Sequence, residues 1–449
     1  AELWKLGIFA KTEHNEVAPA QHEVAPIFTS ANIATDHNQL TMEIMKKVAA
    51  KHGLACLLHE KPFAGVNGSG KHNNWSISTD TGINLLEPGD SPRENAQFLL
   101  FLAAVIKAVD EHQDLIRASV ATAGNDHRLG ANEAPPAIVS IFVGDELEKI
   151  LESIENGSDY HHKGKTFMKI GVDVLPAIPR DTTDRNRTSP FAFTGNKFEF
   201  RMLGSSLSIA CPNQILNIIV AESLCEFADE LEKADDFTDA LNKLIRRTIK
   251  EHKRIIFNGN NYSEEWVAEA ERRGLLNLKS TPEALSYYIS EKNVALFEKF
   301  GVLSRAEMHA RYEIQLENYC KQLHIEALTM IDMIKKDIIP AVCSYMKDIS
   351  KEALNKKQLN AEICCELEET LLKKLSALSA ELYRKMEALE KVVNEQPSFE
   401  DILEKAMYYR NSVFASMEDT RATADEIESL VGEKYWPYPT YGKLLFSVV

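Results

Sequence analysis

The sequence predicts an α+β protein, because its two parts differ in pattern. Residues 1–215 mix short runs rich in Val, Ile and Phe with loops rich in Gly, Pro and Asn, which is typical of strands joined by turns. Residues 216–449 show long, charged helical patterns with few turn signals. We therefore expect a mixed first part that carries the polar motifs and a mainly helical second part of the same unit, with a boundary near residue 215.

Four runs in the first part have the composition of strands. They are LACLLHEKPF (54–63), NNWSIST (73–79), AIVSIFVG (137–144) and KFEFRML (197–203). In the last run, Glu199 and Arg201 alternate with two phenylalanines. A strand would therefore place the two charges on one face and the two aromatic rings on the other.

Capping signals mark two helix starts. Ser91 is a predicted N-cap, followed by Pro92 at the first helical position and by Glu94, which completes a capping box before the apolar run AQFLLFLAAVIKAV. Ser304 and Glu307 repeat this signature in the second part.

The second part contains two further helical patterns. Pro340 is predicted to kink or end the first helix, and a second one covers 367–393. The predicted apolar face of the first consists of Leu323, Leu328, Ile331, Ile334, Ile338 and Val342.

Composition excludes several classes of protein. Lysine plus arginine is 51 against 67 aspartate plus glutamate, a formal charge of -16, so nucleic acid and anionic membranes are poor candidate partners. Seven cysteines without CxxC spacing are typical of reduced thiols in a cytoplasmic protein. No apolar run approaches the roughly 20 residues that span a bilayer. The first residues lack a signal peptide's basic start and resemble the middle of a helix, so we expect further sequence upstream.

Polar residues, glycine and proline concentrate in four segments. They are HNEVAPAQHEVAP (14–26), KPFAGVNGSGKHNNWS (61–76), RLGANEAPPA (128–137) and DRNRTSPFAFTGNKFEFR (184–201). In the first, Glu16 and Glu23 would repel each other in one cleft unless a divalent cation neutralised them, and carboxylate oxygens suit Mg²⁺ or Mn²⁺. Solvated surface glutamates are the open alternative. His14 and His22 are interpreted as hydrogen-bonding neighbours and left out of the site.

The remaining segments are ambiguous when each is taken alone. Glycines beside Asn67 and Gly68 would let backbone amides approach a ligand, and His72 could bind a cation, yet the spacing is not that of a P-loop and a hairpin turn is the plainer interpretation. Arginines and carboxylates near Glu199 would suit a metal beside an anionic substrate, although any one of them is more often part of a surface salt bridge.

Taken together and in this order, the four segments closely resemble the catalytic signatures of glutamine synthetase, specifically its type III form. The resemblance runs through the chain, including YWPYPTYG near the C-terminus. It implies a catalytic domain with a curved, mainly antiparallel sheet and flanking helices, followed by a long, mostly α-helical part. It also implies ATP-dependent ligation of ammonia to L-glutamate through a γ-glutamyl phosphate.

The resemblance implies a role for each matching residue. Glu16 and Glu23 look like ligands of a first Mg²⁺ or Mn²⁺, and His72 and Glu199 like ligands of a second, nearer the ATP phosphates. The other matching positions are substrate residues Asn67, Gly68 and Arg128, the proton acceptor Glu133, the phosphate-steadying Arg187 and Arg201, and the nucleotide-site residues Asn74, Ser76 and Lys197.

Three departures from the family pattern affect these expectations. The spacings from Glu16 to Glu23 and from Arg128 to Glu133 are each one residue shorter than in type I enzymes. Ala192 stands where type I enzymes carry a further arginine. The family also supplies one more carboxylate to each metal from an upstream ExE strand, and none precedes Glu16, so we expect this chain alone to bind metal weakly and to turn over little.

Two rival interpretations stay open. A relative of the family could ligate glutamate to polyamines or other amines, which the type III motifs argue against. A catalytically silent assembly or regulatory protein would have lost its ligands, whereas the four expected ones are present. For a full-length enzyme, the resemblance implies a homo-oligomer in the form of a double ring.

Overall fold

The computed structural model describes residues 1–16, 18, 20–60, 70–130, 134–158, 167–168, 178–179, 187–440 and 443. The fold is α+β, as predicted, and it divides into two compact units, Ala1–Met308 and His309–Val449. The change in composition near residue 215 falls inside a helix of the first unit.

The first unit is built around a four-stranded sheet in the order β3-β8-β7-β4. The β3–β8 and β8–β7 pairs are antiparallel, and β7–β4 is parallel. The strands are β3 (Lys71–Trp75), β4 (Ile141–Phe142), β7 (Phe191–Phe193) and β8 (Phe198–Leu203). Three predicted strand runs therefore contribute strands, whereas the described part of the fourth, 54–60, contains none.

Aromatic packing fixes the inner face of this sheet. Phe198 and Phe200 are fully buried, and the ring of Phe191 stacks on that of Phe198 with centroids 4.7 Å apart. Their alternation with charged residues is the pattern predicted from KFEFRML. Because side chains alternate along a strand, the polar residues of β8 lie on the other face.

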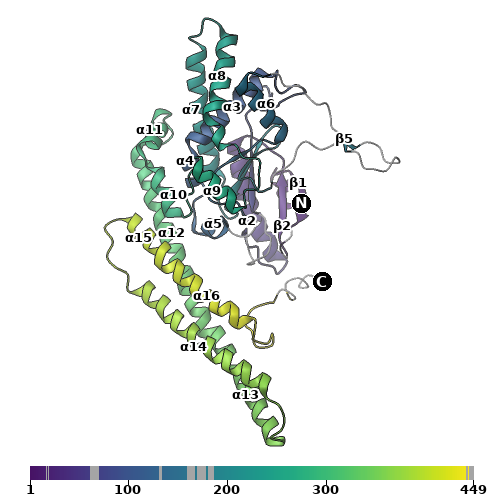
Figure 1. The fold of residues 1–449 in the computed structure, drawn as a ribbon, viewed down its shortest axis with the longest axis vertical. Helices are drawn as coiled ribbons and strands as arrows, with labels where there is room; N and C mark the ends of the chain where they lie inside the picture. Colours follow the sequence, from purple (N-terminus) through teal and green to yellow (C-terminus); the bar gives the residue numbers. More distant parts are fainter. Residues whose placement is uncertain are drawn as a thin grey trace. The chain divides into compact units, whose positions relative to one another are not determined.

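Helices pack around the sheet, and α3, α7 and α8 lie side by side (Figure 1). The helix α3 begins at Ala96 rather than near Ser91, because Asn95 is its N-cap and accepts a hydrogen bond from the Phe98 amide. The helices of this unit after β3 are α3 (Ala96–Glu111), α4 (Gln113–Ala118), α5 (Ala123–Arg128), α6 (Asp145–Asn156), α7 (Ala210–Leu231), α8 (Phe237–His252), the short η1 (Lys253–Ile255), α9 (Glu264–Arg272), α10 (Thr281–Tyr288) and α11 (Glu291–Lys299).

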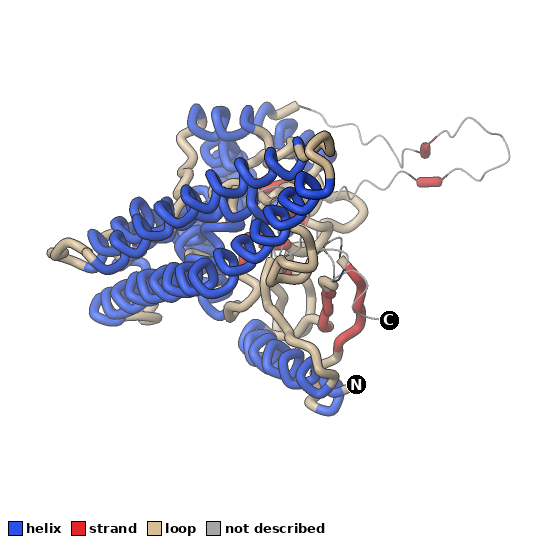
Figure 2. Tube along the Cα trace, turned by 90° about the horizontal axis from the view of Figure 1, so that it is seen from below, coloured by secondary structure: helices blue, strands red, loops and turns tan. Residues whose placement is uncertain are grey.

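The N-terminal residues form a separate antiparallel hairpin between two helices. Figure 2 shows its two strands in red, near the N-terminus. The elements are α1 (Glu2–Lys5), β1 (Ala10–Asn15), β2 (His22–Pro26) and α2 (Ala31–Lys51). In its register, His14 stands opposite Glu23 and Asn15 opposite His22. A further short antiparallel pair joins β5 (Phe167–Met168) to β6 (Ile178–Pro179).

Helices make up the described secondary structure of the second unit. Its first helix begins in the last residues of the first unit, where Ser304 and Glu307 bond reciprocally as the capping signature predicts. Pro340 does not end the helix. The π-helical segment η2 directly precedes α13, and Pro340 is the second residue of α13, which continues to Leu359. The elements are α12 (Arg305–Met333), η2 (Ile334–Ile338), α13 (Ile339–Leu359), α14 (Glu366–Asn394), α15 (Ile402–Tyr408), η3 (Tyr409–Phe414) and α16 (Ala415–Glu428).

The predicted apolar face of the long helix is largely buried. Leu323 and Val342 are both 1% exposed, whereas Leu328 is 44% exposed and so does not belong to that face. The helix predicted over 367–393 corresponds to α14. None of the seven cysteines forms a disulfide. Among the described residues, no helix is long and apolar enough to cross a membrane.

Candidate active site

Strand β3 and the residue that follows it present three of the predicted site residues on one face. His72, Asn74 and Ser76 are exposed, whereas the intervening Asn73 and Trp75 are buried. The buried side chains fasten the strand to α7: Asn73 Nδ2 donates to Asn213 Oδ1 at 2.7 Å, and Trp75 Nε1 to Asn217 Oδ1 at 2.9 Å. The alternation of a strand thus directs the three polar side chains away from the core.

Strand β8 extends the same polar face. Asn74 is paired with Glu199 in the ladder, so the two side chains lie on one side of the sheet. Arg201 NH2 donates to Glu199 Oε2 at 2.6 Å, and both residues are largely buried. Lys197 directly precedes the strand and shares this alternation. We call the set His72, Asn74, Ser76, Lys197, Glu199 and Arg201 the β3–β8 polar face.

A second cluster forms on the β1–β2 hairpin, where Glu16 and Glu23 approach each other. The Nε2 atom of His14 lies 2.9 Å from Glu16 Oε1 and 2.9 Å from Glu23 Oε2. The possible ligand atoms of these three residues all lie within 4.8 Å of one another. The sequence-based prediction left His14 out of the site, although the two-residue spacing of His14 and Glu16 was a signal that their side chains share a face.

Electrostatic effects link the hairpin cluster to the β3–β8 polar face. Burial, followed by the hydrogen bond and charge of Glu16, raises the pKa of Glu23, and Glu199 adds to this effect. Burial, followed by the charge of Arg201, lowers the pKa of His72 to about 4, while Glu199 and Glu16 act in the opposite sense. His72 as a residue is exposed to solvent, yet protein atoms surround enough of its imidazole ring to disfavour the charged form. The four predicted metal ligands therefore influence one another across two sheets.

Arg128 lies inside the protein rather than on its surface. It is 6% exposed, and its guanidinium donates to the backbone carbonyls of Leu203 at 2.6 Å and Arg201 at 2.5 Å. The β3–β8 ladder is irregular between Lys71 and Asn73, so Arg128 bonds to β8 beside that irregularity. Gly70 makes room for it, because a Cβ atom there would lie 2.7 Å from Arg128 Cζ.

Sequence analysis also missed Glu60. This carboxylate is 6% exposed, accepts a hydrogen bond from the Ser205 amide, and raises the pKa of both Arg128 and Lys71 against the lowering effect of burial. The net pKa of Lys71 is lowered to about 8. No local pattern in LLHEKPF distinguishes this glutamate from a surface one.

The remaining residues singled out from the sequence are Arg187, Ala192, Asn67, Gly68 and Glu133. Arg187 is exposed, and its carbonyl oxygen accepts a hydrogen bond from the Tyr262 hydroxyl at 3.4 Å. Ala192 is buried and stands opposite Glu199 in the β7–β8 ladder. Asn67, Gly68 and Glu133 lie outside the described residues.

Comparison with known proteins identifies the family. The glutamine synthetase catalytic domain matches residues 1–138, and the glutamine synthetase C-terminal domain matches residues 240–357. The chain is 52% identical over 450 residues to a glutamine synthetase of Butyrivibrio fibrisolvens, covering 100% of this chain and 64% of the relative. The chain belongs to the glutamine synthetase family.

A second relative agrees with the type III resemblance of this glutamine synthetase family member. The type-3 glutamine synthetase of Dictyostelium discoideum is 48% identical over 453 residues, covering 99% of this chain and 62% of the relative. The chain thus spans somewhat less than two thirds of these relatives. Among solved structures, the match to "Apo GmaS without ligand" has a TM-score of 0.44 and 17% identity, covering 71% of this chain and 57% of that one.

The residues present in this glutamine synthetase family member fit divalent cations. Glu16 and Glu23 place two carboxylates together, and burial, followed by the hydrogen bond and charge of Glu16, raises the pKa of Glu23. A neutral imidazole is the form that a metal requires, and the lowered pKa of His72 keeps the ring neutral near pH 7. Carboxylate oxygens with one imidazole suit Mn²⁺ or Mg²⁺.

Proposed function

We propose that the chain is the catalytic part of a glutamine synthetase, which joins ammonia to L-glutamate at the expense of ATP. The observation that best supports this proposal is the β3–β8 polar face, where His72 and Glu199 lie among polar and cationic groups, Glu199 acts electrostatically on Glu23, and Glu16 acts on His72. Carboxylates gathered beside cationic side chains suit the transfer of a phosphoryl group to an anionic acceptor.

The reaction needs two steps, because a carboxylate is a poor electrophile. A γ-carboxylate oxygen of glutamate first attacks the terminal phosphorus of ATP, which forms γ-glutamyl phosphate and releases ADP. Ammonia then attacks the acyl carbon, and phosphate leaves to give glutamine. In this proposal Arg201 and Arg187 would neutralise charge on the transferred phosphoryl group, and Arg201 is already oriented by Glu199.

Two divalent cations would supply charge neutralisation when bound. Glu16 and Glu23 would hold the first, with His14 as their hydrogen-bonding neighbour, and His72 and Glu199 would hold the second. The protein's own contribution is to keep His72 neutral and the carboxylates close together. The nucleotide would be bound by three further residues of the β3–β8 polar face, Asn74, Ser76 and Lys197.

Substrate orientation and proton transfer would come from Arg128, the last residue of α5, and from Glu133. The type III resemblance implies that Arg128 binds the substrate carboxylate and that Glu133 accepts a proton from ammonium. Ammonium must lose this proton before it can attack. Because Arg128 bonds to β8 backbone carbonyls in this structure, contact with glutamate would require its guanidinium to leave those carbonyls. Asn67 and Gly68 would bind the glutamate amino group. A cytoplasmic homo-oligomer, a double ring in the full-length enzyme, is the assembly that we propose.

The proposal is tested by binding and by turnover. Mn²⁺ titration followed by electron paramagnetic resonance should show binding that weakens at least about tenfold in Glu199→Gln, since a metal would lose a charged ligand. Phosphate release should require both glutamate and ammonium. Faster turnover with alkyl amines than with ammonium would favour a γ-glutamyl-amine ligase. Failure of an ATP analogue to bind, even after an upstream ExE segment is added to the chain, would favour the silent assembly protein.

A further inference from the structure

The side-chain amide of Asn84 bonds to three separate backbone or side-chain groups. Its Oδ1 atom accepts from Ser76 Oγ at 2.9 Å and from the Leu86 amide at 2.9 Å. Its Nδ2 atom donates to the Asn196 carbonyl oxygen at 2.8 Å. Asn84 therefore connects the end of β3 to the turn between β7 and β8, which lie far apart in the sequence.

Both connected segments carry residues proposed for the nucleotide. The single hydroxyl hydrogen of Ser76 is shared between Asn84 Oδ1 and the Asn196 carbonyl oxygen, each 2.9 Å from Ser76 Oγ. That carbonyl belongs to the tight turn Thr194–Lys197, which is closed by the Thr194 amide bonding to the Lys197 carbonyl at 2.8 Å. The position of Lys197 relative to Ser76 is thus set through one carbonyl group and one amide side chain.

The turn has further restraints that make its position depend on the same loop. Asn196 Nδ2 donates to Glu87 Oε2 at 3.2 Å, three residues beyond Asn84. Gly195 has φ +95°, a backbone conformation that side chains disfavour, so the turn is built on a glycine. Contacts from the 84–87 segment therefore hold both the main chain and the side chain of Asn196.

The loop that carries Asn84 is itself anchored. Leu86 is fully buried, and Ser78 and Asn84 form an antiparallel bridge. Asn95 Nδ2, at the start of α3, donates to the Glu87 carbonyl oxygen at 3.1 Å. Packing and hydrogen bonds therefore restrain the backbone around Asn84. A residue that orients its neighbours needs such restraint.

We propose that Asn84 is a positioning residue for the nucleotide, holding Ser76 and the Thr194–Lys197 turn in the arrangement that binds ATP. This inference rests on the proposed function. An asparagine is required because one side chain must accept from a hydroxyl and donate to a carbonyl at the same time. Aspartate keeps the shape but replaces the donor with an anionic oxygen beside the Asn196 carbonyl, so the turn would be repelled instead of held.

The test compares two variants at this position with a control in the same loop. Asn84→Asp and Asn84→Ala remove the bond to Asn196, whereas Thr79→Val removes only two bonds within the loop, from the Ile83 amide to Thr79 Oγ1 and between the Thr79 and Thr81 hydroxyls. Binding of a fluorescent ATP analogue is measured with Mn²⁺ present. Mn²⁺ affinity without nucleotide and thermal unfolding are measured on the same samples.

Both Asn84 variants should bind the analogue about tenfold more weakly, with Mn²⁺ affinity within about twofold of the parent, and Thr79→Val should match the parent in both. Parent-like analogue binding by Asn84→Asp and Asn84→Ala would overturn the inference while leaving the proposed function intact. Equal losses of Mn²⁺ and analogue binding would also overturn it, because they indicate general damage to the fold. If the parent chain binds no analogue, the proposed function fails and the inference fails with it.

Discussion

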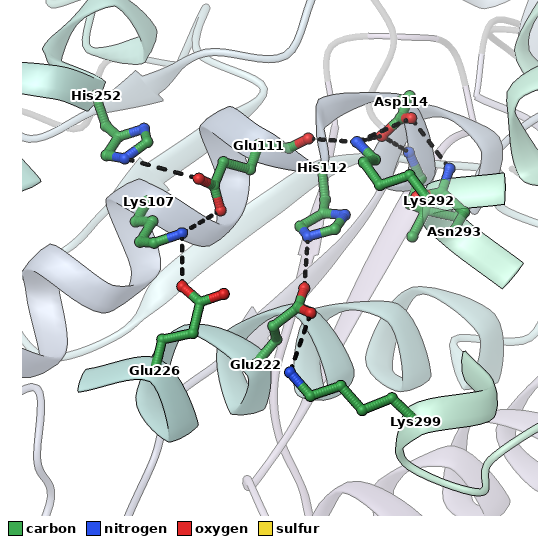
Figure 3. Close-up of polar contacts among 11 residues, drawn as sticks. Lys107, Glu111, His112, Asp114, Glu222, Glu226, His252, Lys292, Asn293 and Lys299 are labelled. Atoms are coloured by element: carbon green, nitrogen blue, oxygen red, sulfur yellow. Dashed lines mark hydrogen bonds and ion pairs between the residues drawn. The ribbon is translucent and has the colours of Figure 1, made fainter. Parts of the chain in front are cut away.

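Two groups of charged residues in the first unit are built in opposite ways. In the network where α3 and α4 meet α7 and α11 (Figure 3), acids face bases. Lys107 Nζ bonds Glu226 Oε2 at 3.0 Å, and His112 Nε2 lies 3.0 Å from Glu222 Oε2. Lys292 Nζ lies 3.3 Å from Asp114 Oδ2. Where two carboxylates of this network share one base, Glu111 and Glu226, that base is the Lys107 ammonium. In the hairpin cluster, by contrast, the two carboxylates share the imidazole of His14.

The difference separates structural charges from candidate functional ones. A charge paired with its opposite offsets the cost of leaving water, so the α3–α4 network helps to hold helices together. Two adjacent carboxylates cost the fold free energy, and such an arrangement is typical of sites where a ligand restores the balance. The direction of the pKa shift of Glu23 agrees with this, since burial first and then the neighbouring Glu16 raise it.

The largest expected effect concerns a fully buried pair on α4 and α5. Arg117 and Asp126 have side chains 1% and 2% exposed, and their closest atoms are 3.2 Å apart. Arg117→Met should lower the free energy of unfolding by about 3–5 kcal/mol, because Asp126 keeps its charge without its cation. Urea unfolding followed by circular dichroism measures this.

A matched exposed pair provides the control for that experiment. Arg247 and Glu230 have side chains 50% and 42% exposed. Arg247→Met should change the free energy of unfolding by less than about 1 kcal/mol. Similar losses in the two variants would show that burial does not distinguish these ion pairs.

A smaller effect is expected where Gly70 accommodates Arg128. Gly70→Ala places a Cβ atom 2.7 Å from Arg128 Cζ, so the guanidinium must leave the carbonyls of Arg201 and Leu203. We expect a loss of about 1–3 kcal/mol in stability, since buried carbonyls would lose their donor. Gly124→Ala in α5, where a Cβ atom meets nothing within 4 Å, should be neutral or stabilising. Equal unfolding midpoints for the two variants would contradict this account.

In the hairpin cluster, removing one carboxylate charge should weaken Mn²⁺ binding without lowering the free energy of unfolding. Glu23→Gln keeps the shape but removes one of two repelling carboxylates, so unfolding stability near pH 7 should stay level or rise. Mn²⁺ affinity should fall at least about tenfold. Calorimetric titration and thermal unfolding of one preparation measure both. A parallel fall in stability would mean that the pair is structural, like those of the α3–α4 network.

The smallest effect is a pH dependence from His112, which faces Glu222, Asp114 and Lys292. Burial, followed by the charge of Lys292, lowers the pKa of His112 below its ordinary value of 6.5. As the pH falls through 6.5, His112 is protonated in the unfolded chain but stays neutral in the folded chain. The free energy of unfolding therefore decreases. His112→Gln should flatten the loss between about pH 7 and pH 5. An unchanged slope relative to the parent would exclude this histidine as its source.

Local periodicity was enough to predict the candidate site in part. The alternation in KFEFR placed Glu199 and Arg201 on one face, and the structure confirms that face. It could not show that His14 lies between Glu16 and Glu23, because this depends on the register of β1 against β2. Nor could it show Arg128 bonded to β8, since that contact joins residues more than seventy positions apart.

The sequence by itself determined the α+β class, the polar motifs and the family, because these depend on local patterns and on the order of motifs along the chain. Tertiary structure decided which carboxylates meet, the Asn95 cap of α3, and the division after Met308. Burial, strand register and close approach are properties of residues distant in sequence. They become fixed only when the elements pack against one another.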